Sequence, residues 1–239
     1  MTLEIFTSYS DRISALPEGT LTEGHLRQFL LSAQPPIEIF YAPFDWCNVA
    51  AKIVIVGITP GRNSMRLAFE AARDSLRSGG SLEEAVRRAK RTGSFSNMRK
   101  NLSSRLDAVG VNAVLGITSC SELFGERADL LHTTSAIRYP VFKDGKNYGG
   151  YSPSLTSHVL LKRFVHEYLT PEIAQFPKAL FVPNGPAVAK ALLMAGLDGR
   201  RCLVGFPHAS NGPGAKDRAK TFEAEKGQMR KKVSEWGCS

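Results

Sequence analysis

The chain has 239 residues, of which 43% are hydrophobic and 22% charged. This length is typical of one α/β domain with a sizeable core. No apolar stretch approaches a membrane span, and the first residues lack the basic and apolar segments of a signal peptide, so we expect a cytoplasmic protein. The net charge of +9 favours a polyanionic partner, because cations that neutralise phosphates release counterions.

Helical and strand patterns alternate along the chain. In chain order we predict a helix at 23–31, a strand at 52–56, helices at 63–78, 82–91 and 97–109, a strand at 131–138, an exposed Gly- and Tyr-rich loop at 143–153, a helix at 157–169 that Pro171 interrupts, a strand at 178–182, a helix at 187–195, a strand at 203–206 and a helix at 215–236. Ser81 and Glu84 have the spacing of a capping box.

The long connections between the predicted strands favour parallel pairing, with helices on both faces of the sheet. The sequence therefore predicts an α/β three-layer sandwich with a four-stranded parallel sheet. We expect a single domain over residues 1–239, with an N-terminal extension at 1–50 and a basic helical insertion at 62–94.

Two short loops follow predicted strands about 150 residues apart. The first reads Gly57-Ile58-Thr59-Pro60-Gly61, and the second contains His208-Ala209-Ser210. The carboxyl ends of parallel strands meet at one edge of a sheet, where α/β proteins bind their ligands. We therefore expect both loops to face one pocket, with glycines that allow a ligand to approach the backbone closely.

The ordered set of motifs resembles the uracil-DNA glycosylase superfamily, whose first motif reads G-x-x-P-G or G-x-x-P-Y and whose second reads H-P-S or N-P-S. Here the two stand as GITPG and HAS. The loop at 93–97 resembles the superfamily's aromatic loop, and the stretches 135–140 and 182–187 resemble the exits of its second and third strands. The resemblance spans roughly residues 50–222 and implies a four-stranded sheet and an enzyme that excises a base from DNA without a cofactor.

Excision leaves negative charge on the departing base, so a preorganised hydrogen-bond donor accelerates the reaction. The resemblance implies that His208 is this donor and that Thr59 orients the attacking water, although Thr59 stands where several branches have Asp or Asn. Phe95 would stack on the extruded base. The implied substrate-binding residues are Gly57, Ile58, Pro60, Gly61, Phe95, Ser135, Ser210 and Asn211.

The basic residues concentrate between positions 62 and 100. This stretch contains ten Lys and Arg residues and four acidic residues. A charge run is often only a solvated helix face, and this alternative is strongest for 216–232. For the earlier segment we expect DNA-backbone contacts from Arg62, Arg87, Arg88, Lys90 and Arg91.

Three further features narrow the function. The four cysteines have no C-x-x-C pair, unlike the iron–sulfur branches of the superfamily, so we predict no metal. Asp45 and Asp144 are the loop acids nearest to a catalytic base, but both are interpreted as surface carboxylates. Two partners are open for Arg138, a phosphate and a carboxylate at the core edge, and the carboxylate is favoured.

Two functions remain open for a monomer that binds single- or double-stranded DNA. One is a glycosylase-like hydrolase that flips out and excises a damaged or modified base. The other is a catalytically inactive member of the superfamily that serves as a nucleic-acid-binding module, which Thr59 and the lack of Asn in 132–135 favour. A nucleotide-binding protein fits less well, because G-x-G-x-x-G and a phosphate-loop lysine are absent.

Overall fold

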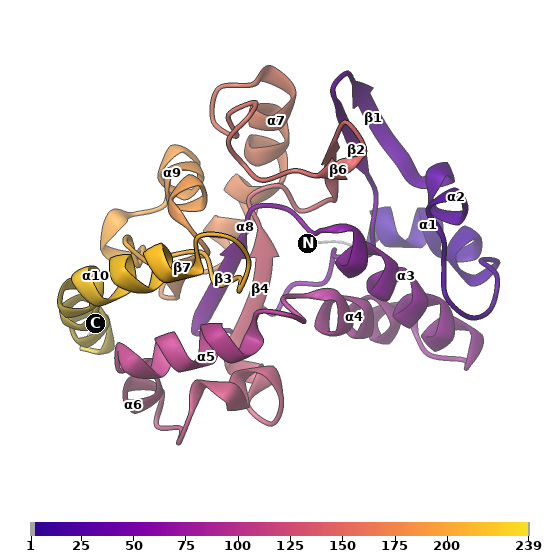
Figure 1. Cartoon of the computed structure of the whole chain (residues 1–239). Helices are drawn as coiled ribbons and strands as arrows, with labels where there is room; N and C mark the ends of the chain where they lie inside the picture. Colours follow the sequence, from indigo (N-terminus) through magenta and orange to yellow (C-terminus); the bar gives the residue numbers. More distant parts are fainter. Residues whose placement is uncertain (1–2, 239) are drawn as a thin grey trace. The chain divides into compact units, whose positions relative to one another are not determined.

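The computed structural model describes residues 3–238. These residues form two compact units, each assembled from three separate stretches of chain. The first unit comprises the chain up to Cys47, Thr59–Ser96 and Ile137–Gly149, and the second comprises Asn48–Ile58, Asn97–Ala136 and the chain from Gly150 onward. Figure 1 labels the elements of both units.

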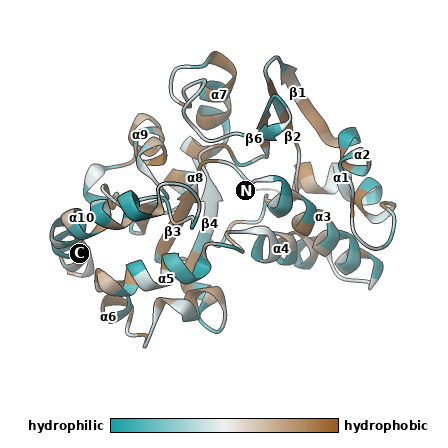
Figure 2. Cartoon of the chain, viewed as in Figure 1, coloured by the Kyte–Doolittle hydropathy of each residue, from teal (hydrophilic) through white to brown (hydrophobic). Residues whose placement is uncertain are grey.

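The second unit contains a parallel sheet. Its strands β3 (Ile53–Gly57), β4 (Leu131–Ser135) and β7 (Leu180–Pro183) lie in the order β4-β3-β7 (Figure 1). The central strand β3 is buried at all five positions and is coloured as hydrophobic in Figure 2, which is the pattern of a strand covered on both faces. The predicted α/β class and the parallel pairing of these three strands are confirmed.

The fourth predicted strand, at 203–206, is wrong. Only one parallel bridge forms there, between Phe181 and Cys202, and the Leu203 N–H donates to the Phe181 carbonyl at 2.8 Å. Gly205 then takes a left-handed φ of +92°, and the Phe206 N–H donates back to the Leu203 carbonyl. Because this turn carries the backbone away from β7, the described part of the sheet has three strands.

The helices predicted in the second unit form, and a short helix at 111–115 adds to them. Pro171 does not end the helix that precedes it, because the backbone stays helical through Leu169 and Thr170, and Pro171 is the second residue of α8. A π-helical turn, Val165–Leu169, joins α7 to α8. The unit's α-helices are α5 (Arg99–Ala108), α6 (Val111–Leu115), α7 (Val159–Phe164), α8 (Thr170–Ala174), α9 (Pro186–Met194) and α10 (Ala215–Gly237), with 3-10 turns η2 (Cys120–Phe124), η3 (Ala128–Leu130) and η5 (Gly199–Arg201).

The first unit contains an antiparallel sheet in the order β1-β2-β5-β6. Its strands are β1 (Leu30–Gln34), β2 (Ile37–Phe40), β5 (Val141–Lys143) and β6 (Lys146–Asn147), and its helices are α1 (Glu4–Ser14), α2 (Glu23–Leu26), η1 (Arg27–Phe29), α3 (Arg62–Arg77) and α4 (Leu82–Gly93). Two predictions are corrected here: the helix at 23–31 ends in the η1 turn before β1, and the loop at 143–153 begins as the β5–β6 hairpin. Asp144-Gly145 supplies its two-residue turn.

The capping box at the start of α4 is confirmed. The Ser81 hydroxyl accepts the Glu84 N–H at 3.2 Å, and the Glu84 carboxylate accepts the Ser81 N–H at 2.8 Å. Two of the amides that a helix leaves unpaired at its N-terminal end are therefore involved in a reciprocal contact.

Replacing Ser81 by Ala should lower the free energy of unfolding by about 1 kcal/mol, because the N-cap acceptor is lost. Urea unfolding followed by circular dichroism measures the change. Ser96→Ala, at an exposed serine without a described hydrogen bond, is the control. Equal stability of the two variants would contradict the assigned cap.

Candidate functional site

The carboxyl edge of the parallel sheet brings together the ends of all three strands. Gly57 is the register partner of Ser135, and the Ala136 N–H donates to the Gly57 carbonyl at 2.8 Å. The Asn184 N–H, just beyond β7, donates to the Val56 carbonyl at 2.8 Å. The exits of β3, β4 and β7 therefore lie side by side.

His208 lies against this edge. A Cβ built on Gly185 would lie 3.4 Å from the His208 Cβ, which is ordinary van der Waals contact, so the two segments lie against each other. The Gly185 φ of +108° is the reason for a glycine at this position. The side chain of Asn184, which is 1% exposed, accepts the Ala209 N–H at 2.7 Å. The strand exits and the His208–Ser210 loop are thus held together within the second unit.

The hydrogen bonds of His208 define its tautomer. The Ser210 N–H lies 3.3 Å from Nδ1, and the Ser210 hydroxyl lies 3.0 Å from the same nitrogen. Because a backbone N–H can only donate, Nδ1 is an acceptor, and the proton of the neutral ring is on Nε2. Among the residues that the structure describes, Nε2 has no hydrogen-bond partner.

Burial lowers the pKa of His208 below its ordinary value, and the positive charges of Arg218 and Arg105 lower it further. At neutral pH the ring is therefore uncharged. Its Nε2–H is a hydrogen-bond donor in a region of positive potential.

The carbonyl groups of the His208 loop are held by α5 and α10. Arg105 donates to the carbonyls of Pro207 and His208 at 3.1 Å each. Arg218 donates to the carbonyl of Ser210 at 3.0 Å and to that of Gly212 at 2.9 Å. Sequence reasoning missed both arginines. Arg105 acts on a loop about 100 positions away, which no local motif marks, and Arg218, although only 8 residues after Ser210, lies in a stretch whose pattern favours a solvated basic helix.

Asn101 also holds the His208 loop, and together with Arg105 and Arg218 it forms what we call the arginine clamp. Asn101 also contacts the predicted site residue Asn211. Its amide donates to the Ala209 carbonyl at 2.8 Å and contacts the Asn211 side-chain oxygen. Asn211 is exposed. The predicted residues Gly57, Ile58, Ser135, His208, Ser210 and Asn211 all belong to the second unit.

The remaining motif residues belong to the first unit, where Thr59 has a structural role. Its hydroxyl donates to the Tyr139 carbonyl at 2.7 Å and accepts the Val141 N–H at 3.0 Å. The hydroxyl thus links the first motif to the segment entering β5. Pro60 and Gly61 are half-buried before α3, and Gly61 is its N-cap.

Phe95 and Lys90 depart from the predicted arrangement. Phe95 is only 9% exposed and has a φ of +53°, so its ring does not form an open stacking platform. The prediction that Lys90 contacts DNA is wrong: its side chain is 2% exposed, and Nζ donates to the Trp46 carbonyl at 2.6 Å.

The other predicted phosphate contacts divide into two groups. Arg87, Arg88 and Arg91 are exposed on α4. Arg62 is engaged within the first unit: its guanidinium lies 4.6 Å from the Phe142 ring centroid and contacts the Glu23 carboxylate.

Asp45 is not the surface carboxylate that the sequence suggested. It is 4% exposed and accepts hydrogen bonds from the hydroxyls of Tyr41 at 2.8 Å and Tyr139 at 2.7 Å. Burial raises its pKa, although the two tyrosines and Arg138 act in the opposite direction. Arg138 lies 4.0 Å from Asp45, so the expected pairing with a core carboxylate is confirmed. Asp144 is exposed, as predicted.

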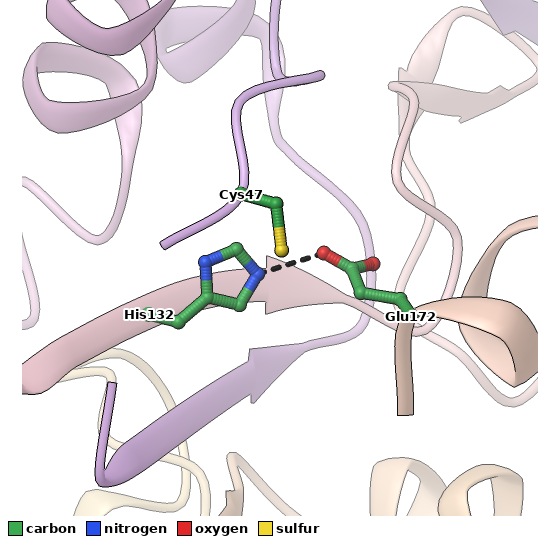
Figure 3. A group of neighbouring side chains, drawn as sticks. All are labelled: Cys47, His132 and Glu172. Carbon is green, nitrogen blue, oxygen red and sulfur yellow. Dashed lines mark hydrogen bonds and ion pairs between the residues drawn. The ribbon is translucent and has the colours of Figure 1, made fainter. Parts of the chain in front are cut away.

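A buried histidine and glutamate form a second cluster in the second unit (Figure 3). His132 Nε2 lies 2.7 Å from Glu172, whose other oxygen accepts the Thr134 hydroxyl at 2.9 Å. The Asn48 N–H donates to His132 Nδ1 at 3.3 Å, so both ring nitrogens are engaged. The cluster therefore ties β4 to α8. Figure 3 also draws Cys47, the last residue of the first unit.

The fold and the site define a mixed α/β protein with a neutral histidine at the carboxyl edge of a parallel sheet. No family model and no solved structure matches the sequence. The chain is 37% identical over 234 residues to the uncharacterized protein YoxB of Bacillus subtilis strain 168, a match that covers 94% of this chain and 90% of YoxB. The chain belongs to the same family as YoxB. None of its described helices combines the length and apolar character needed to span a membrane.

Replacing Arg218 by Gln should raise the pKa of His208 towards its ordinary value, because a positive charge that disfavours the protonated ring is removed. Titration of the histidine side-chain resonances by NMR measures the shift. Arg200→Gln is the control, since the Arg200 side chain is 90% exposed and pairs with Asp198. An unchanged or lower pKa in Arg218→Gln would contradict the proposed electrostatics.

Proposed function

We propose that this chain is a DNA glycosylase-like hydrolase of the uracil-DNA glycosylase superfamily. It acts as a monomer, flips a damaged or modified nucleotide out of DNA and hydrolyses its N-glycosidic bond. The observation that carries the proposal is the state of His208: a neutral imidazole, protonated on Nε2, at the carboxyl edge of the sheet beside two arginines.

This arrangement suits the stabilisation of a departing base. As the glycosidic bond breaks, the sugar becomes oxocarbenium-like and the base gains negative charge. A hydrogen bond from His208 Nε2 strengthens as this charge grows, so it favours the transition state over the bound substrate. Arg105 and Arg218 act on the base through space, since their described hydrogen bonds go to loop carbonyls.

The attacking water receives less help from Thr59 than the sequence suggested. The one hydroxyl proton of Thr59 is donated to the Tyr139 carbonyl. In this proposal the rate enhancement comes from stabilising the negative charge on the departing base. The oxocarbenium-like sugar that forms as the base leaves then reacts with a water molecule that no base has activated. We assign Thr59 to positioning the first motif.

The exposed arginines of α4 support the DNA-binding part of the proposal. Extruding a nucleotide costs a few kcal/mol of unstacking, which contacts between the protein and the DNA backbone must offset. Arg87, Arg88 and Arg91 have exposed side chains, so they take this role in place of the buried Lys90.

The second candidate function is a catalytically inactive nucleic-acid-binding module. The structural use of the Thr59 hydroxyl favours it, as does the burial of Phe95. The two functions share a DNA-binding surface and differ in whether any base is released.

The test of catalysis is a single-turnover assay for alkali-labile abasic sites, run on a panel of oligonucleotides with modified bases. His208→Ala should lower cleavage by at least the order of 10²-fold expected for losing one preorganised donor, with DNA binding nearly unchanged. His166→Ala, at an exposed histidine of the π-helical turn, is the matched control.

If His208→Ala cleaves as fast as the parent protein, the assigned role of His208 is wrong. If the parent protein binds the oligonucleotides but releases no base from any of them, the binding module is the better description.

Thr59→Val should destabilise the protein by about 1–3 kcal/mol, because the buried Tyr139 carbonyl and Val141 N–H lose their partner. Thr59→Ser should retain most of the stability. Where Thr59→Val stays folded, its cleavage rate should remain within a few-fold of the parent rate. A 10²-fold loss of cleavage in folded Thr59→Val, measured beside its thermal unfolding, would restore the water-orienting role.

DNA affinity should fall steeply with salt, and removal of the α4 arginines should flatten this dependence. The triple variant Arg87→Ala, Arg88→Ala, Arg91→Ala should reduce the slope of log affinity against log salt by up to about 0.9 for each lost phosphate contact. A matched triple variant of exposed lysines on α10, Lys216→Ala, Lys220→Ala, Lys231→Ala, should change it less. Equal slopes for both variants would place the DNA face elsewhere.

A further inference from the structure

A surface cavity of about 420 Å³, open to solvent, lies between α5 and the segment that contains η2. Its walls belong entirely to the second unit. They combine two cationic side chains, four serines, one acid and one aromatic ring: Arg99, Lys100, Ser103, Ser104, Ser119, Ser121, Asp107 and Phe124. We call this cavity the α5 cavity.

The α5 cavity and the His208 loop use different faces of α5. Asn101 and Arg105, four residues apart, both donate to the loop. Ser103 lies midway between them in sequence, which places it about 200° around the helix from either one. One short helix therefore separates His208 from the cavity.

The cationic groups of the α5 cavity outnumber its one acid, and that acid is already engaged. Asp107 accepts the Ser119 hydroxyl at 2.8 Å and the Cys120 N–H at 2.6 Å, so its two oxygens bind the wall formed by the 119–120 segment. Lys100 is exposed, and the guanidinium carbon of Arg99 lies 5.4 Å from the centroid of the Phe124 ring. Two cationic side chains and one acidic side chain give the lining a net positive charge.

Ser103 contributes a hydroxyl group to the cavity wall. Its side chain lines the cavity although the residue is only 6% exposed. Within residues 3–238 its hydroxyl makes no hydrogen bond. A hydroxyl that opens into the cavity without a described partner is available to a molecule bound there.

We propose that the α5 cavity binds one phosphate group of a nucleic-acid backbone. Phosphate offers several oxygens to the mixed set of donors here, a guanidinium, an ammonium and serine hydroxyls. The identity of the partner as a nucleic acid rests on the proposed function, whereas the anion site rests on the cavity itself. Free phosphate has the same chemistry and is separated from the backbone by the experiment.

A phosphate in the α5 cavity constrains the path of the bound strand. The cavity and the His208 loop are separated by roughly the 10–12 Å diameter of a helix with its side chains. Asn101 and Arg105 hold the loop on one side of α5 while the phosphate is held on the other. The helix therefore acts as a spacer between the backbone contact and the base site.

The experiment measures the affinity of the full chain for a double-stranded oligonucleotide without any modified base, by fluorescence anisotropy over a range of salt. The double variant Arg99→Gln, Lys100→Gln should lose at least about tenfold in affinity, the scale of one charge-assisted hydrogen bond. Its salt slope should decrease by about 0.9, for one phosphate. Ser103→Ala, which only removes a hydroxyl, should lose a few-fold.

The matched control is Lys162→Gln, Arg163→Gln on α7. This pair has the same residue types, both side chains are exposed, and the Arg163 guanidinium carbon also lies over a phenylalanine ring, 5.5 Å from the Phe164 centroid. Thermal unfolding of all variants verifies that they fold. Equal losses in the two double variants would overturn the proposal.

A second arm separates the backbone from free phosphate. Single methylphosphonate groups, which remove the charge of one phosphate, are placed in turn along the oligonucleotide. In the parent protein one position should weaken binding, and in Arg99→Gln, Lys100→Gln that position should have no further effect. If inorganic phosphate shifts the Ser103 and Ser104 amide resonances but no methylphosphonate position matters, the site binds free phosphate and the backbone assignment is overturned.

The two proposals fail separately. Because the oligonucleotide carries no base to excise, the methylphosphonate result does not depend on catalysis. A protein that cleaves modified DNA yet shows no position-specific effect would keep the glycosylase function and lose the α5 phosphate site.

Discussion

The site depends on the hydrogen bond between the Asn184 side chain and the Ala209 N–H. The predicted fourth strand would have held the His208 loop through a ladder of backbone bonds, but only the bridge at Cys202 forms. A buried amide at the end of β7 takes over that task. Its side-chain nitrogen also lies 3.5 Å from the Met98 sulfur, just before α5, so Asn184 links the sheet edge to both flanking segments.

The arginine clamp and the chemistry of His208 are two consequences of one arrangement. Arg105 and Arg218 must approach the loop closely to reach its carbonyls. Burial lowers the pKa of His208 and keeps the ring neutral, and at that distance the two positive charges lower this pKa further. A neutral ring with Nδ1 occupied by Ser210 leaves Nε2 to donate. The order of the loop and the charge state of His208 are therefore coupled, and we expect a substitution at either arginine to change both.

Local signals predicted the parts of the fold that local interactions determine. The β-branched run of β3 and the capping box of α4 need no distant partner, and both form as predicted. His208 does lie at the sheet edge, although the strand from which this position was predicted does not form. The sequence pattern of 203–206 failed because the turn at Gly205 outweighs the strand preference of its neighbours.

Other features depended on contacts that no local pattern contains. Asp45 is paired with Tyr139 across 94 positions, so its burial was not visible in the sequence. Lys90 did carry a signal: it follows the buried Val86 by four residues and therefore shares its helix face. A positive charge on that face indicates a buried lysine with a polar partner, and the Trp46 carbonyl is that partner. Counting charges along the chain obscured this periodicity.

Two histidines of the second unit show why burial alone does not identify a functional group. His132 is fully buried, and Asn48 and Glu172 engage both of its nitrogens, so it can lose neither partner without leaving a buried polar group unpaired. His208 is half-buried, and only its Nδ1 is engaged within the described chain. The difference lies in the remaining nitrogen, because a ring whose hydrogen bonds are complete stabilises a fold, whereas a ring held through one nitrogen is positioned to use the other.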